Sequence, residues 1–234
     1  KCGGPASISS LLFFLENENI YRSSTCTVHT TSDKSACMNT IDNPQLHDNR
    51  HYVYYGDLYT RAEFPIIASF IPEGATVIDL GCGNGALMAY LMQQKHVTAE
   101  GMDISPSGVA VANSRSLSVV RGEIDKKDSY ALYADEQFDY AVCNVTLQMV
   151  LYPEILLEQM KRIAKHVIVS FPNFAYIGNR LDLLVHGVMP RPMLYGYAWY
   201  NTGHIHQLTI ADFLAWSKMN GLSIARAQYV GGFK

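Results

Sequence analysis

Apolar and polar positions follow two periods along most of the chain. Short runs rich in β-branched residues have the length of buried strands. They alternate with segments whose apolar residues recur three and four positions apart, as in amphipathic helices. Strands are predicted at 75–80, 97–103, 117–121, 138–144, 166–170 and 222–230. Helices are predicted near 65–70, at 87–92, after 105, from about 153 to 163, and from 209 to just before 221. This alternation predicts an α/β fold: a Rossmann-like, doubly wound, mostly parallel sheet.

Two of the predicted helices carry start signals. Ser105 precedes Pro106, which is an N-cap followed by proline at the first helical position. Thr209 and Asp212 have the spacing of a capping box. These pairs predict where the two helices begin.

The segment 77–85 reads Val-Ile-Asp-Leu-Gly-Cys-Gly-Asn-Gly. A predicted strand therefore runs directly into Gly81, Gly83 and Gly85, and a predicted helix follows. Glycines let the backbone approach a ligand where a Cβ atom would collide, and the start of a helix offers free N–H groups. The segment predicts a nucleotide-binding turn.

Two ligands fit this turn. The first and second glycines with Ala86 satisfy the dinucleotide fingerprint, and Asp103 lies where a ribose-binding acid is expected, so NAD is one reading. Asp79 stands just before the glycines, where it could accept backbone N–H bonds and stay near a cationic ligand. Glu123 follows the third strand, where it could meet an adenine edge. Acids at these three places favour S-adenosylmethionine (SAM) over NAD.

Composition narrows the class of protein. The chain has 234 residues, of which 48% are hydrophobic and 17% charged, and its net charge is −3. Without a basic stripe or a long apolar run, neither nucleic acid nor a membrane is an expected partner. The five cysteines show no C-x-x-C spacing, which argues against a zinc knuckle or a disulfide framework and favours a cytoplasmic location. No metal site is predicted.

The chain divides into two parts by composition. Residues 1–46 are rich in Ser and Thr, show little periodicity, and are expected to be a disordered or non-native extension, with Met38 as the biological start. Residues 47–234 are expected to form the ligand-binding domain. Within it, the stretch 171–207 interrupts the alternation with prolines and aromatic residues. It follows the carboxyl end of a strand, the ligand side of such sheets, so we expect a lid or acceptor insert.

Several blocks of the chain resemble the MetW family, a methionine-biosynthesis branch of the class I SAM-dependent methyltransferase fold. The resemblance covers about residues 62–224. It rests on the glycine segment and on four further blocks: Phe-Asp-Tyr at 138–140, Thr-Leu-Gln at 146–148, Val-Ser-Phe-Pro-Asn-Phe at 169–174, and Trp-Tyr through Ile-His to Thr-Ile-Ala-Asp-Phe at 199–213. It implies a Rossmann-like SAM fold, and the lack of sequence for the usual last antiparallel strand implies a C-terminal truncation. It also implies a link to homoserine O-acyltransferase as a partner.

The resemblance also assigns the cofactor site. Asp79 and the three glycines would cradle SAM, Asp103 would bind its ribose, and Glu123 would approach its adenine. The family usually has Glu at 103 and Asp at 123, so the reach of both carboxylates differs here. The full set of expected cofactor-binding residues is Asp79, Gly81, Cys82, Gly83, Gly85, Asp103, Ile104, Glu123 and Asn144.

Methyl transfer needs alignment of donor and acceptor, and a base where the acceptor loses a proton. His204 and His206 are the candidate catalytic bases, since alternation puts both on one side of an extended segment; holding the lid by hydrogen bonds is the alternative role. The candidate substrate-binding residues are Gln148, Asn173, Tyr195, Trp199 and Tyr200. An ordinary turn is the structural alternative for Asn173, and a loop core is the alternative for the three aromatic residues. Helix capping is the alternative role of Asn144.

Three functions follow from these patterns. The first is a SAM-dependent methyltransferase acting on an unidentified small molecule. The second is a SAM-binding accessory partner of homoserine O-acyltransferase, and the third is an NAD-dependent oxidoreductase.

Overall fold

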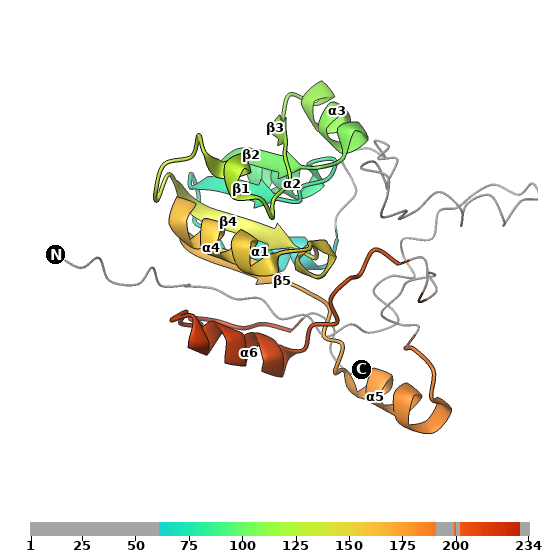
Figure 1. Ribbon diagram of the computed structural model, residues 1–234. Coiled ribbons are helices and arrows are strands. Elements are labelled where there is room, and N and C mark those ends of the chain that lie inside the picture. Colours follow the sequence, from blue (N-terminus) through green and yellow to red (C-terminus); the bar gives the residue numbers. More distant parts are fainter. Residues whose placement is uncertain (1–60, 191–198, 200–201, 230–234) are drawn as a thin grey trace, which may run out of the picture.

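The structure is a computed structural model that describes residues 61–190, 199 and 202–229 (Figure 1). Its strands form one parallel sheet in the order β3-β2-β1-β4-β5. They are β1 (Thr76–Leu80), β2 (Thr98–Asp103), β3 (Ser118–Arg121), β4 (Phe138–Asn144) and β5 (Ala164–Ser170). The predicted α/β class and the parallel sheet are confirmed.

Helices precede, connect and follow these strands, and most of them pack against the sheet. They are α1 (Glu63–Phe70), α2 (Ala86–Lys95), α3 (Pro106–Ser114), α4 (Pro153–Ile163), α5 (Ile177–Leu181) and α6 (Ile210–Met219). Shorter turns are the 3-10 helices η2 (Lys127–Tyr130) and η3 (Leu147–Met149) and the π-helical η4 (Asp182–His186). Within residues 61–190, 199 and 202–229, no helix is long and apolar enough to cross a membrane.

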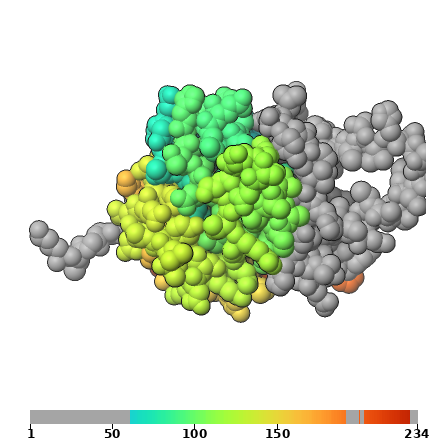
Figure 2. Space-filling model, turned by 90° about the horizontal axis from the view of Figure 1, so that it is seen from above, coloured from blue at the N-terminus to red at the C-terminus, as the bar shows by residue number. Residues whose placement is uncertain are grey.

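The core lies on both faces of the sheet because successive strand residues point to opposite sides. Ile78 of β1 belongs to one buried cluster with Met160 of α4 and Phe213 of α6. Val77, its neighbour in sequence, belongs to the other, with Ile67 of α1. The α2 and α3 helices share this second face. Seen from above, the connection from β3 to β4 lies between α3 and α4 (Figure 2).

The two helix starts expected from the sequence are confirmed. The Ser105 hydroxyl accepts a hydrogen bond from the Gly108 N–H at 3.1 Å at the start of α3. The Thr209 hydroxyl accepts one from the Asp212 N–H at 3.1 Å at the start of α6. The side chain of each cap replaces a hydrogen bond that the first turn of a helix cannot make for itself.

The predicted strand at 222–230 is wrong for residues 222–229, which pair with no strand. Leu222 is buried against α6 and the core, and Ile224 packs there in part, but most of the segment is exposed. Alternation of apolar and polar residues satisfies a strand pattern without guaranteeing a hydrogen-bonding partner. Arg226 instead places its guanidinium over the ring of Phe70, 4.5 Å from the centroid.

The expected insert at 171–207 contains more regular structure than the sequence indicates. It includes α5 and η4, which project from the body of the domain (Figure 1). The extension 1–46, the proposed start at Met38, and the candidates Tyr195 and Tyr200 lie outside the described residues, so these remain predictions.

Candidate functional site

The glycine loop, residues 81–85, leaves the carboxyl end of the central strand β1. The chain adds β2 and β3 on one side of β1, and β4 and β5 on the other. The strand order therefore reverses between β1 and β4, and ligands of open α/β sheets bind in the crevice at such a point. The loop borders this crevice.

The loop has the left-handed backbone that favours glycine. Gly81 has φ 81°, Gly83 has φ 56° and Gly85, the N-cap of α2, has φ 73°. A Cβ atom at Gly81 would lie 2.6 Å from Cγ2 of Thr146. One at Gly85 would lie 2.5 Å from Cδ1 of Leu117. The left-handed backbone and these neighbouring side chains together disfavour any larger residue at 81 and 85.

Asp103 holds the loop in place. Its Oδ2 accepts a hydrogen bond from the Gly83 N–H at 2.7 Å, and its Oδ1 accepts one from the Ser105 N–H at 2.8 Å. The expectation that Asp79 accepts the backbone N–H bonds of the loop is wrong, because Asp103 accepts them. The strand register explains the difference: Leu80 pairs with Met102, so the next residue of β2, Asp103, lies beside the loop itself.

Asp79 is a buried acid with a different character. It is 2% exposed, and no group in the described part of the chain donates a hydrogen bond to its carboxyl. Burial, and secondly the charge of Asp103, raises the pKa of Asp79 to about 7. Such a group gains most from a nearby cation, which would restore its charged form.

Cys82 belongs to the glycine loop and lies near both Asp79 and Asp103. Burial, and then the charges of Asp79 and Asp103, raise the pKa of its thiol far above the ordinary value. The thiolate is the nucleophilic form of cysteine, so a thiol held neutral is unsuited to nucleophilic catalysis. Cys82 serves the loop as a small buried residue.

The remaining predicted cofactor residues lie at the neighbouring strand ends. Ile104 is 39% exposed beyond β2. Glu123, beyond β3, forms an ion pair with Lys126 at 2.8 Å. Asn144 ends β4; its Oδ1 accepts a hydrogen bond from the Ser170 hydroxyl at 2.6 Å, and its amide donates to Glu63 at 3.4 Å. Asn144 thus ties β4 to β5 and α1.

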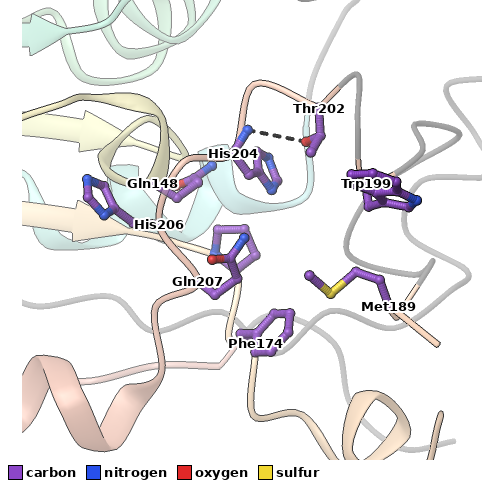
Figure 3. A pocket seen from close by; sticks show the side chains of 9 residues that line it. Gln148, Phe174, Met189, Trp199, Thr202, His204, His206 and Gln207 are labelled. Carbon is purple, nitrogen blue, oxygen red and sulfur yellow. Dashed lines mark hydrogen bonds between the residues drawn. The ribbon is translucent and has the colours of Figure 1, made fainter. Parts of the chain in front are cut away.

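A pocket lies beyond the ends of β4 and β5 (Figure 3). It collects four of the predicted acceptor residues from distant parts of the sequence, two of them histidines. The described residues that line it are Gln148, Pro172, Phe174, Met189, Trp199, Thr202, His204, His206 and Gln207. Asn173 is not among them; its Oδ1 accepts hydrogen bonds from the N–H groups of Ala175 and Ile210 at 3.2 and 3.3 Å, which is a structural role.

Gln148 organises one end of this pocket. Its backbone carbonyl accepts hydrogen bonds from the N–H groups of Ile205 and His206, at 2.9 and 3.1 Å. Its side-chain amide donates to the carbonyl of Val145 at 2.9 Å. Among the described residues, its buried Oε1 has no hydrogen-bond partner, and neither has Nε2 of His206. These contacts bring the predicted histidine segment to the end of β4.

Two residues beside the site were missed by the sequence analysis. Thr146 packs against Gly81, and it belongs to the Thr-Leu-Gln block, whose position after β4 was the only signal for it. Val145 has φ 51°, a conformation that is a real outlier for a β-branched residue. Its N–H donates to the hydroxyl of Ser170 at 2.9 Å, which helps to hold the strained turn. Backbone strain of this kind concentrates at functional sites.

The sheet order and the glycine loop flanked by acids define the class of protein: the Rossmann-like fold of class I SAM-dependent methyltransferases. The YcgJ protein of Bacillus subtilis shares this fold, with a TM-score of 0.52 at 16% identity over 68% of this chain and 67% of that one. A SAM-dependent methyltransferase of Thermotoga maritima, described as a possible histamine N-methyltransferase, gives 0.48 at 20% identity over 68% and 69% of the two chains.

The chain belongs to the MetW family, because the family model for methionine biosynthesis protein MetW matches residues 61–233. The chain is also similar to the bifunctional methionine biosynthesis protein MetXA/MetW of Rhodopirellula baltica, with 33% identity over 171 residues. The match covers 69% of this chain and 27% of that protein. The chain thus spans about a quarter of the length of this relative.

Proposed function

We propose that the chain binds SAM at the glycine loop and transfers its methyl group to a small molecule held in the pocket around Gln148. The observation that carries the proposal is Asp79, a buried acid without a described hydrogen-bond donor, next to a glycine loop at the point where the strand order reverses. A buried carboxylate is costly without a cation. SAM is a cation at its sulfonium centre and at its amino group.

The residues present fit SAM. Asp79 would face its positive charges, and the N–H groups of the loop would lie along its amino-acid part. Asp103 already accepts two backbone hydrogen bonds, yet each carboxylate oxygen has two acceptor positions, so ribose hydroxyls can still bind to it. The exposed Ile104 and the half-buried Glu123 would contact the adenine. When bound, SAM supplies a methyl group that is made electrophilic by the sulfonium.

The pocket around Gln148 would hold the methyl acceptor. Thr146 packs on Gly81, and Gln148, two residues further on, lines the pocket, so one short turn joins the two sites. Methyl transfer is a displacement that depends on alignment and on exclusion of water. His204 and His206 are the residues proposed to take a proton from the acceptor. Trp199, also at this pocket, would shield the acceptor from water.

The test is calorimetric titration of the protein with SAM and, separately, with NAD. We expect SAM to bind and NAD not to bind. Binding of NAD without SAM would overturn the proposal in favour of an oxidoreductase. Incubation with SAM labelled in its methyl group and a metabolite extract then tests transfer, and label in a small molecule is the expected result.

A second function is favoured by one observation: the relative from Rhodopirellula baltica carries a MetXA and a MetW part in one protein. We propose, as the alternative, that the chain is a SAM-binding partner of homoserine O-acyltransferase. The projecting segment of α5 and η4 offers a surface for such a partner, because Leu184 and Val185 are 82% and 68% exposed (Figure 1). Apolar side chains gathered on a surface mark protein interaction sites.

Co-purification of the tagged chain with the acyltransferase of the same organism tests this alternative. Leu184→Asp should weaken the complex at least tenfold. Leu132→Asp is the matched control, since Leu132 is 96% exposed on a different connection, between β3 and β4. Equal binding by both variants would remove the segment from the interface. SAM binding and a complex without any methyl transfer would favour the accessory role over the enzyme.

A further inference from the structure

Glu63, the first residue of α1, is an acid at the edge of the sheet where the glycine loop begins. Its Oε1 accepts a hydrogen bond from Nδ2 of Asn144, the last residue of β4, at 3.4 Å. Asp79 pairs with Val142 in the register of β1 and β4. Two residues further along these strands, Asn144 lies level with Gly81, the first glycine of the loop. Glu63 is therefore one hydrogen bond away from the strand end that faces the loop.

The alternation of side chains puts this acid on the same face of the sheet as Asp79. Val77 of β1 and Val142 of β4 belong to the buried cluster that includes α1. Because successive side chains point to opposite faces, Asp79 and Asn144, each two residues further on, point to the face of α1 as well. Two acids thus lie on one face beside the glycine loop, Asp79 inside the sheet and Glu63 at the strand ends.

The carboxyl of Glu63 is buried, and its hydrogen bonds use only one of its two oxygens. Glu63 is 4% exposed, and Nε of Arg61 lies 2.5 Å from its Oε1, the oxygen that also accepts from Asn144. Among the described residues, no hydrogen bond reaches Oε2, which has two acceptor positions. The side chain keeps 6% of its surface exposed, and Oε2 is not one of the fully enclosed polar atoms. A small group of a ligand can therefore meet this oxygen.

The charges on this face restrict the group that can bind there. Asp79 and Glu63 are both acids, so an anionic group would be repelled and a cationic one attracted. A buried carboxylate gains most from a partner that is charged and also donates hydrogen bonds. An ammonium group meets both conditions in a compact form, since it has three donors and no acceptor.

We propose that Glu63 binds the α-ammonium group of SAM through Oε2, with Asn144 orienting the carboxyl, while Asp79 faces the sulfonium. A short carbon chain separates the two positive centres of SAM, and the two acids follow each other along one face of the sheet. This inference rests on the proposed function for the identity of the ligand. Glu63 is a binding residue that selects cofactors with an α-amino group, and it takes no proton from the acceptor.

A purely structural role of Glu63 makes a different prediction. An acid in the first turn of a helix interacts favourably with the helix dipole, whatever ligand the protein binds. Loss of that interaction would lower the stability of the fold and would affect all adenosine ligands alike. Loss of an ammonium contact would affect only the ligands that carry an ammonium group.

The test compares S-adenosylhomocysteine with 5′-S-(3-carboxypropyl)-5′-thioadenosine, which is the same molecule without its amino group. Neither compound has a sulfonium, so the comparison isolates the contribution of the ammonium. Calorimetric titration of the full chain at neutral pH measures both affinities. We expect S-adenosylhomocysteine to bind at least ten times more tightly, which is the effect of one hydrogen bond between charged groups. Equal affinities would overturn the proposal.

Variants assign this preference to Glu63. Glu63→Gln keeps the shape of the side chain and removes its charge, so the preference should nearly disappear while the deaminated compound binds as before. Glu73→Gln, at a side chain that is 75% exposed in the turn before β1, is the matched control and should keep the preference. A folded Glu63→Gln protein with the full preference refutes the inference.

A second variant covers the case in which Glu63→Gln does not fold, as judged by circular dichroism. Glu63→Asp keeps the charge and draws the carboxyl back by one methylene, so the preference should fall several-fold. An unchanged preference in this variant refutes the inference.

Failure of the inference and failure of the proposed function give different results. Binding of SAM and of S-adenosylhomocysteine without any preference for the amino group would keep the cofactor site and reject the role of Glu63. If neither SAM nor either of the two thioadenosine compounds binds, the cofactor site itself is rejected, and the inference falls with it.

Discussion

Replacement of Asp79 by Asn is the sharpest physical test of the site. Asp79 lies in the central strand, where burial and then the charge of Asp103 raise its pKa from 3.8 to about 7. Asn has nearly the same shape and no charge to bury. The variant should therefore be more stable than the wild-type protein at every pH at which Asp79 is ionised in the unfolded chain.

The size and the sign of the effect follow from this shift. About three pKa units correspond to about 4 kcal/mol. Below pH 4 the carboxyl is protonated in both the folded and the unfolded chain. Between about pH 4 and 7 only the unfolded chain releases the proton, so the wild-type free energy of unfolding falls as pH rises. The advantage of Asp79→Asn should grow across this window by about 4 kcal/mol and stay constant above it.

Urea unfolding of both proteins at a series of pH values between 3.5 and 8.5 measures this difference. A gain of about 4 kcal/mol corresponds to roughly 8–16 °C in Tm for a chain of this size, so thermal scans are a second readout. Asp128→Asn, at an exposed position, controls for the loss of a carboxylate as such. A difference between wild type and Asp79→Asn that does not change from pH 4 to 7 would refute the argument.

The same carboxyl couples stability to the proposed ligand. A cation such as SAM prefers the ionised form of Asp79, so SAM affinity should rise with pH until about pH 7 is passed. In Asp79→Asn the affinity should be at least tenfold lower and lose this dependence. The variant would then be more stable and bind more weakly, which is the trade-off expected where a site stores an unfavourable charge.

Three further changes test other parts of the molecule. Gly83→Val should reduce SAM affinity at least a hundredfold in calorimetry; Gly74→Val, at φ 75° in open space, carries a similar backbone strain and should bind normally. Asp139→Asn should flatten the acid limb of urea stability, because hydrogen bonds from a lysine and a threonine lower the pKa of this carboxyl to about 2, so wild-type stability is lost as pH falls from about 4 through 2. Cys82 and Cys143 should resist iodoacetamide at pH 8 in the folded protein, as read by peptide mass mapping, because burial raises the pKa of both thiols, that of Cys143 to about 12.

The sheet could be predicted closely because its central strands, β1 and β4, are buried on both faces. The observed β4 has the predicted bounds, and the strand at 117–121 differs from β3 by one residue. The helix predicted at about 153–163 coincides with α4, which Pro153 begins. Continuous apolar runs bounded by turns are strong signals in such folds. At 222–229 the signal was simple alternation, and there the prediction was wrong.

The site could be predicted as a set of residues but not as a set of contacts. Sequence spacing brings Asp79, the glycines and Asp103 to neighbouring strand ends, yet it does not say which acid reaches the loop. That depends on the register of β1 and β2, which places Asp103 level with the loop and Asp79 two residues inside the sheet. Likewise, the motif after β4 indicated Gln148, while its free Oε1 depends on the turn at Val145.

This difference in depth explains how two acids close in space can have separate roles. Asp103 at the edge accepts hydrogen bonds from Gly83 of the loop and from Ser105, and so positions the loop. Asp79 is too deep for those donors and remains a buried acid that a cationic ligand could pair with. Exchanging the two depths would need a shift of two or more residues in the β1–β2 register, which would move the buried side chains of β2 away from their present packing partners. The core on both faces therefore holds the acids in these roles, so the electrostatics of the site depend on packing far from it.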